Sequence, residues 1–103
     1  MADEATSDDP STGDRVRRHV FISGRVQGVT YRASTRRAAT ERGVDGWVQN
    51  LDDGRVEAVF EGPEAAVDDL LTWCQDGPEM AIVDGVDAEA ESPEGIEGFE
   101  VRR

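Results

Sequence analysis

The sequence predicts a single α+β domain in which two helices cover one face of an antiparallel sheet. Its 103 residues suffice for one domain with one modest core. Stretches with alternating apolar residues and stretches with an apolar residue every three to four positions follow one another as strand, helix, strand, strand, helix and strand. An Asp-Gly pair between the two middle strands indicates an antiparallel hairpin.

The first 14 residues differ in composition from the rest of the chain. Residues 1–14 are rich in Ser, Thr, Asp, Pro and Gly and contain almost no apolar side chains. We expect a disordered acidic tail there and place the domain at residues 15–103. The acidic, polar start Met1–Glu4 is unlike a secretory signal, so a cytoplasmic location is expected.

The first strand is predicted from Arg15 to Ser23. Val16, Val20 and Ile22 share one of its faces, and Phe21 lies on the other. Apolar residues on both faces indicate a strand in the interior of the sheet. The only histidine of the chain is in this strand, on the side of Phe21, and we expect an ordinary strand residue rather than a catalytic group.

The first helix is predicted from about Thr30 to Arg42, where Gly43 is a natural stop. Its inward face is expected to carry small residues at spacings of three to four, namely Ser34 and Ala38, together with Tyr31. Small residues allow a helix to approach a sheet closely.

The second and third strands are predicted to form a hairpin over residues 44–61. Apolar residues alternate over 44–49 and again over 56–60. The intervening segment 50–54 reads Asn-Leu-Asp-Asp-Gly and is a strong turn signal.

The second helix is predicted to open at Gly62–Glu64 and to end at Gly77-Pro78. Its apolar residues fall at i, i+3, i+4 and i+7, which places four of them on the core side: Val67, Leu70, Leu71 and Cys74. Cys74 is therefore expected to be a small buried hydrophobe rather than a nucleophile. As the only cysteine, it cannot form a disulfide within its own chain.

A fourth strand is predicted over residues 82–90, with Val86 and Ala88 facing inward. After a turn region at 92–98, Phe99 and Val101 suggest a short terminal strand. The complete order βαββαβ, with a short last strand, is that of the ferredoxin-like α/β sandwich.

The segment between the first strand and the first helix is the strongest candidate site. It runs from Gly24 to Arg32, and the first N–H groups of a helix have no partner within the helix. A glycine-containing loop at this point can direct several N–H groups at one anion, and the guanidinium fork of Arg32 matches phosphate oxygens. The loop lacks the Gly-Lys-Ser/Thr ending of a Walker motif. From spacing alone, an ordinary tight turn remains the alternative.

Four blocks of the sequence resemble one known family: residues 24–32 (GRVQGVTYR), 43–50 (GVDGWVQN), 53–57 (DGRVE) and 61–62 (EG). Together they closely resemble the acylphosphatase family, over about residues 16–103. The resemblance implies a ferredoxin-like fold and the hydrolysis of a small acyl phosphate to a carboxylate and phosphate. It also implies a metal-independent enzyme without an organic cofactor.

The resemblance further implies roles for individual residues. Arg32 matches the phosphate-binding arginine of the family, and Asn50 matches its water-orienting asparagine. The loop that binds phosphate through backbone N–H groups corresponds to Arg25, Val26, Gln27, Gly28 and Val29. We expect Tyr31 and Trp47 to pack rather than to stack on substrate. Two departures are Gln49, where members often have Arg, and the terminal Arg102-Arg103, where members often end in an aromatic residue.

The net charge of −12 is the clearest compositional signal, and all eleven basic residues are Arg. Such a surface repels nucleic acid and anionic membranes, and no apolar run approaches the roughly 20 residues of a membrane span. The acids could form an interaction surface or reflect adaptation to high salt. Their spread along the chain favours the second explanation, and the composition resembles that of cytoplasmic proteins from halophilic archaea.

Three functions are compatible with these features. The favoured one is a monomeric acylphosphatase whose only partner is its small-molecule substrate. A module that holds carbamoyl phosphate or a similar anion without turnover, as in a hydrogenase-maturation protein, is the first alternative. An RNA-binding module of the same fold is the second, disfavoured by the charge and by the lack of paired exposed aromatic residues on the central strands.

Overall fold

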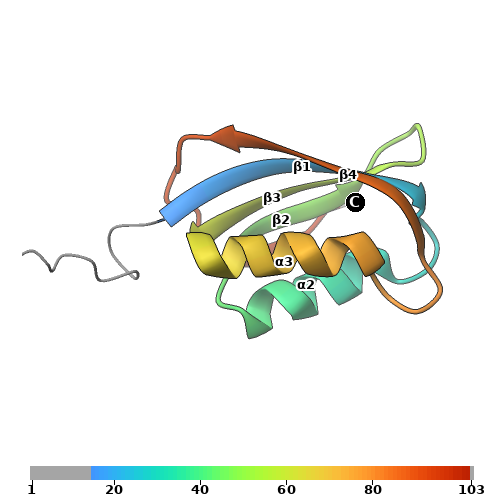
Figure 1. Cartoon of the computed structure of the whole chain (residues 1–103), viewed down its shortest axis with the longest axis horizontal. Coiled ribbons are helices and arrows are strands. Elements are labelled where there is room, and N and C mark those ends of the chain that lie inside the picture. The colour runs from blue at the N-terminus through green and yellow to red at the C-terminus, as the bar shows by residue number, and fades with distance from the viewer. Residues whose placement is uncertain (1–14, 103) are drawn as a thin grey trace, which may run out of the picture.

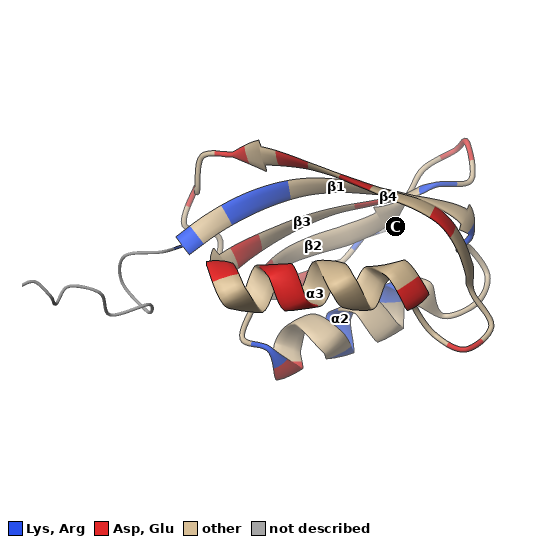
Figure 2. Cartoon of the chain, in the orientation of Figure 1, with Lys and Arg blue, Asp and Glu red and all other residues tan. Residues whose placement is uncertain are grey.

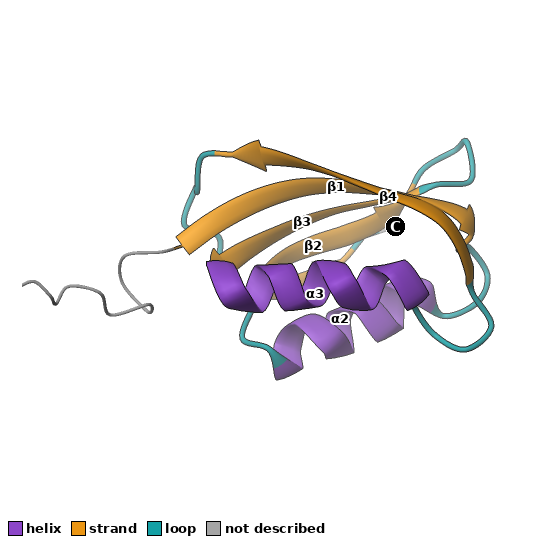
Figure 3. Ribbon diagram, in the orientation of Figure 1, coloured by secondary structure: helices purple, strands orange, loops and turns teal. Residues whose placement is uncertain are grey.

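A computed structural model describes residues 15–102, and the predicted tail at 1–14 lies outside the described residues. The structure has two layers, a five-stranded sheet and a pair of helices on one of its faces (Figures 1 and 3). In chain order the elements are β1 (Arg15–Arg25), α2 (Tyr31–Glu41), β2 (Asp45–Asn50), β3 (Val56–Pro63), α3 (Glu64–Asp76), β4 (Ile82–Glu91) and β5 (Phe99–Val101). The predicted order of elements is confirmed.

The strands lie in the order β4-β1-β3-β2-β5, so β1 is an interior strand, as its two apolar faces predict. The pairs β1–β4, β1–β3 and β2–β3 are antiparallel, but β5 pairs with β2 in parallel. The expectation of a wholly antiparallel sheet is therefore wrong for this last pair. The connection after β4 crosses to the opposite edge of the sheet, so β5 runs back in the direction of β2.

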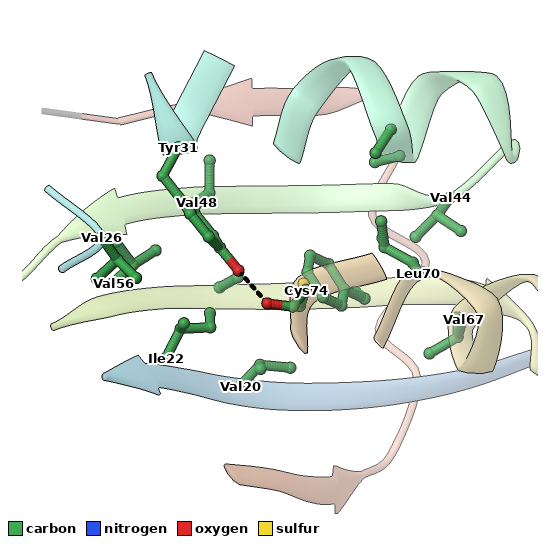
Figure 4. Close-up of a cluster of buried hydrophobic side chains, with 14 residues drawn as sticks. Val20, Ile22, Val26, Tyr31, Val44, Val48, Val56, Val67, Leu70 and Cys74 are labelled. Carbon is green, nitrogen blue, oxygen red and sulfur yellow. Dashed lines mark hydrogen bonds between the residues drawn. The ribbon is translucent and has the colours of Figure 1, made fainter. Parts of the chain in front are cut away.

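The core lies between the sheet and the two helices (Figure 4). The predicted burial of Val67, Leu70 and Cys74 on α3 is confirmed, whereas Leu71 is only half-buried. Each fully buried aliphatic side chain contributes about 1.5–3 kcal/mol. Burial also raises the pKa of the Cys74 thiol to about 12. The hydroxyl of Tyr31 donates to the Cys74 carbonyl at 2.8 Å, which ties α2 to α3.

The inward face of α2 differs from the prediction by one position. Tyr31 and Ala38 are buried as expected, but Ser34 is half-buried and the core side is completed by Thr35 and Ala39. A buried threonine is tolerated here because its hydroxyl donates to the Tyr31 carbonyl at 2.7 Å, one turn earlier.

The strand β4 is covered less than predicted. Val86 is half-buried, but Ala88 is exposed, as is the whole second half of the strand over residues 87–91. Ala88 pairs with Val20 and shares its face, yet β4 is an edge strand with no neighbour beyond it among the described residues. No helix within residues 15–102 is long and apolar enough to cross a membrane.

Candidate functional site

Four segments meet at one end of the sheet, around a cavity of about 230 Å³. They are the β1–α2 loop, the first turn of α2, the last residue of β2 and the last residue of β5. The lining residues are Val26, Gly28, Thr30, Tyr31, Arg32, Ala33, Asn50 and Val101.

The β1–α2 loop, residues 26–30, has a backbone suited to an anion. Gly28 has a φ of 75°, and Thr30, which caps α2, has a φ of 60°. A β-branched residue in this left-handed conformation stores on the order of 1–3 kcal/mol of strain, a cost typical of functional loops. Within residues 15–102, no backbone N–H group of 26–30 donates to a protein acceptor. These donors, with the positive end of α2, form a cradle for negative charge.

The side chain of Arg32 is held at the cavity by the backbone that follows β5. It lies in the first turn of α2, and its Nη1 donates to the backbone carbonyl of Arg102. The Arg102 N–H in turn donates to the Val48 carbonyl at 2.8 Å, so this carbonyl is itself fixed to β2. Arg32 has no other hydrogen-bond partner among residues 15–102. A guanidinium has five N–H groups, so within this part of the chain Arg32 keeps further donors that can bind ligand oxygens.

The side chain of Asn50 carries an unusual atom. Asn50 is the last residue of β2, and its Oδ1 is fully buried without a hydrogen-bond donor among the described residues. It is the one buried side-chain oxygen or nitrogen in residues 15–102 for which this holds. An unsatisfied buried acceptor costs about 1–3 kcal/mol. Because Asn50 lines the cavity, a water or a ligand donor can satisfy it there.

The five loop residues expected at the site are placed differently from one another. Val26 and Gly28 line the cavity, and the Val26 side chain is buried. Arg25 is exposed at the end of β1 and pairs with Ile82 of β4. Gln27 and Val29 do not line the cavity: Gln27 bonds to the β2–β3 turn, and Val29 packs against the core.

Several lining residues carry no signal of this role in the sequence. Tyr31 is buried, as predicted for a packing residue, but it also lines the cavity. Val101 and the Arg102 carbonyl reach the site because β5 pairs in parallel with β2. Every residue has a backbone carbonyl, so residue types cannot predict this contact. Only the position of β5 in the sheet could have indicated it.

The only histidine lies on the helix-free face of the sheet and not at the cavity. His19 Nε2 is 2.6 Å from a Glu57 oxygen, and Nδ1 is 3.1 Å from a Glu91 oxygen. Burial would lower the pKa of His19, but the bonds to the two carboxylates outweigh it and the pKa is raised. Trp47, on the same face, is half-buried under the guanidinium of Arg102, 4.3 Å from its ring centroid.

Comparisons with known proteins agree on one family. The acylphosphatase family profile matches residues 18–101. An acylphosphatase of Natronomonas pharaonis is 62% identical over 90 residues, which cover 87% of this chain and 98% of that protein. One from Haloquadratum walsbyi is 66% identical, covering 86% and 96%. The structure of an acylphosphatase from Coxiella burnetii superposes with a TM-score of 0.84 at 39% identity, covering 86% and 94% of the two chains. This chain belongs to the acylphosphatase family.

Proposed function

We propose that this chain hydrolyses small acyl phosphates to a carboxylate and inorganic phosphate, with Arg32 and the β1–α2 loop binding phosphate and Asn50 orienting the water. Acylphosphatases are hydrolases of acyl phosphates, and the chain belongs to that family. The observation that carries the assignment of roles is the buried Oδ1 of Asn50, which lacks a hydrogen-bond donor within residues 15–102 and lies in the same cavity as Arg32.

The phosphate-binding half of the site is electrostatic. An acyl phosphate carries negative charge on its phosphoryl oxygens, and that charge persists as the bond to the leaving carboxylate loosens. The N–H groups of residues 26–30, which have no acceptor in the described part of the chain, and the guanidinium of Arg32 compensate it with groups that are already in position. The carboxylate is a good leaving group, so no strong general acid is needed.

The water-binding half of the site is Asn50. Its amide oxygen accepts a hydrogen bond from the attacking water and orients it, but an amide is a poor base. The water oxygen forms a bond to phosphorus while the bond from phosphorus to the carboxyl oxygen breaks, and the carboxylate leaves with the electron pair. We assign the proton of the water to a phosphate oxygen of the substrate itself. Substitution of a nearby carboxylate, such as Asp52 or Asp53, should therefore leave turnover intact.

The assay is phosphate release from acetyl phosphate or benzoyl phosphate in molar salt with a chelator present. Loss of one preorganised donor typically costs about 10²–10³-fold in rate, so Arg32→Gln should lose at least that much. Arg36→Gln, on the exposed side of α2, is the matched control and should retain activity. Tight anion binding without turnover in the unmodified protein would instead favour the anion-binding module. Dependence on an added metal would overturn the mechanism.

We also propose that the protein is a salt-adapted cytoplasmic monomer that does not bind nucleic acid. Asp and Glu are spread over α3, β3, β4 and the loops rather than gathered in one patch (Figure 2). At ~1 M salt the Debye length is only ~3 Å, so this charge would scarcely hinder an anionic substrate. Light scattering in molar salt and fractionation of source cells test the oligomeric state and the location. Titration with labelled RNA tests the RNA-binding alternative.

A further inference from the structure

The side chain of Gln27 connects two parts of the site that are distant in sequence. Its Nε2 donates to the Leu51 carbonyl at 2.8 Å and to the Arg55 carbonyl at 2.9 Å, 24 and 28 residues away. A primary amide has two N–H groups, so both donors of Gln27 are used on the β2–β3 turn.

The turn that receives these bonds is already closed by its own backbone. The Leu51 N–H donates to the Arg55 carbonyl at 2.8 Å, and the Gly54 N–H donates to the Leu51 carbonyl at 3.2 Å. Each of the two carbonyls has two lone pairs, and Gln27 supplies the second donor to both. The Gln27 amide thus bridges the two sides of the turn by hydrogen bonds to the Leu51 and Arg55 carbonyls.

Gln27 lies between the residues that line the cavity and the turn that follows Asn50. Gln27 stands between Val26 and Gly28, which line the cavity, and Leu51 directly follows Asn50. We propose that Gln27 is a positioning residue, whose side chain fixes the distance between the phosphate-binding loop and the water held by Asn50. This role rests on the proposed function, in which the loop holds phosphate and Asn50 holds the nucleophile.

The physical reason is the geometry of in-line attack. The water must approach phosphorus opposite the leaving carboxylate, at a near-attack distance, and a misplacement of about 1 Å can cost about 10²-fold in rate. Phosphate is held by the loop and Arg32, and water by the end of β2. Among the described residues, Gln27 is the one side chain that joins the β1–α2 loop directly to the β2–β3 turn by hydrogen bonds.

Two variants of Gln27 separate positioning from binding and from stability. Gln27→Leu keeps the approximate volume but removes both bonds, and Gln27→Glu places a carboxylate against two carbonyl oxygens. We expect kcat for benzoyl phosphate to fall about 10–10²-fold in Gln27→Leu and further in Gln27→Glu. Competitive inhibition by inorganic phosphate should change less than about threefold, because the phosphate ligands stay on the loop.

The matched control is Gln49→Leu. Gln49 lies in the β2–β3 hairpin that Gln27 contacts, and it donates one side-chain bond of 2.7 Å to Glu57, on the face of the sheet away from the cavity. It should lose stability without the large fall in kcat, when all variants are assayed well below their melting temperatures. Unchanged kcat in Gln27→Leu would overturn the proposal. So would a loss of phosphate affinity as large as the loss of kcat, or an equal loss of kcat in the control.

A measurement without turnover keeps the proposal distinct from the proposed function. In an NMR titration of the unmodified protein with inorganic phosphate, the N–H signals of residues 26–30 and of residues 51–55 should both shift. In Gln27→Leu the loop signals should still shift, while those of the turn should respond much less. Equal responses of the turn in both proteins would overturn the coupling. Absence of turnover in the unmodified protein would instead overturn the proposed function and the catalytic purpose of Gln27, while the coupling between loop and turn would still be tested by the titration.

Discussion

Replacement of the buried carboxylate Glu61 by its neutral isostere is expected to destabilise this protein severely. Glu61 lies on the helix-free face of β3 and is fully buried. It is covered by the connection between β4 and β5, residues 92–98. The substitution Glu61→Gln keeps the size of the side chain but removes its charge and turns one acceptor atom into a donor.

The loss can be worked out from the bonds that Glu61 makes. Its Oε1 accepts from the backbone N–H groups of Gly95 at 2.7 Å and Ile96 at 3.1 Å. Its Oε2 accepts from the Glu94 N–H at 2.9 Å and from Arg17 Nη1 at 3.0 Å. A glutamine amide can retain the first pair, but its NH₂ group must then face the second pair of donors.

The expected cost follows from the lost pair. Two charge-assisted bonds disappear and a donor faces donors, although Arg17 still pairs with Glu91 at 2.9 Å. Breaking a buried ion pair by removing one partner costs about 3–5 kcal/mol. For a domain of this size, in which 1 kcal/mol shifts Tm by about 4–8 °C, that corresponds to a fall in Tm of about 12–40 °C.

The same carboxylate makes stability depend on pH. Burial alone would raise the pKa of Glu61, but the bonds from the Glu94 N–H, Arg17 and the Gly95 and Ile96 N–H groups outweigh it, so its pKa is lowered. The stabilisation is therefore present above the pKa of an unfolded-state carboxyl and is lost as pH falls through the lower folded-state value. The free energy of unfolding of Glu61→Gln should therefore lack this contribution to its fall at acid pH.

The assay is urea unfolding in molar salt, followed by circular dichroism between pH 3 and pH 7. Glu94→Gln is the control, since that side chain is mostly exposed and only 3.7 Å from the same Arg17. It should change stability by less than about 1 kcal/mol. If Glu61→Gln and Glu94→Gln have the same free energy of unfolding at pH 7, the four hydrogen bonds of Glu61 do not stabilise the protein by the expected amount.

Three further predictions concern single side chains. Asn50→Ala should lower kcat for benzoyl phosphate at least about 10²-fold while leaving inhibition by inorganic phosphate nearly unchanged, and equal losses in both would contradict its role as the water ligand. In the unmodified protein, His19 contributes stability that is fully present below pH 6.5 and is lost as pH rises through its raised pKa, and His19→Gln should lack this contribution. Free energies of unfolding measured at pH 6 and pH 9 test this, and an equal change between the two pH values in both proteins would refute it. The thiol of Cys74, fully buried and with a pKa of about 12, should react with a thiol reagent only on unfolding, so rapid labelling of the native protein at pH 8 would disprove its burial.

Most of the fold could be predicted from periodicity, because each helix and strand buries one regular face. The errors occur where that rule is weak. The small residues of α2 differ little in hydrophobicity, so the pattern does not separate Ser34 from Thr35, and Ala88 lies on the correct face of an edge strand that stays exposed there. The parallel pairing of β5 depends on where the connection over residues 92–98 crosses the sheet, which no local pattern encodes.

The site could be predicted in part for a similar reason. Arg32, Asn50 and the glycine loop depend on particular residue types, a guanidinium, an amide and a glycine that tolerates positive φ, and these can be recognised in the sequence. The Arg102 carbonyl does not, because any residue supplies one. Glu61 alternates in β3 like a solvent-facing residue, and its burial results from the later segment that folds over it. The family resemblance predicts that Gln27 belongs to a phosphate-binding loop, and only the structure shows that its side chain contacts the opposite turn.

The hydrogen bond between Arg32 and the carbonyl of residue 102 spans 70 positions of the chain. During synthesis on the ribosome, the loop and its arginine emerge long before the residue that holds the guanidinium. Contacts of such long sequence separation form late in folding, after the loop-closure entropy has been overcome. A nascent chain that stopped short of residue 102 would retain the glycine loop and Asn50 but would lack the contact that aims the arginine. Catalytic competence should therefore arise only once this residue has left the ribosome, and activity should distinguish chains that reach it from chains that do not.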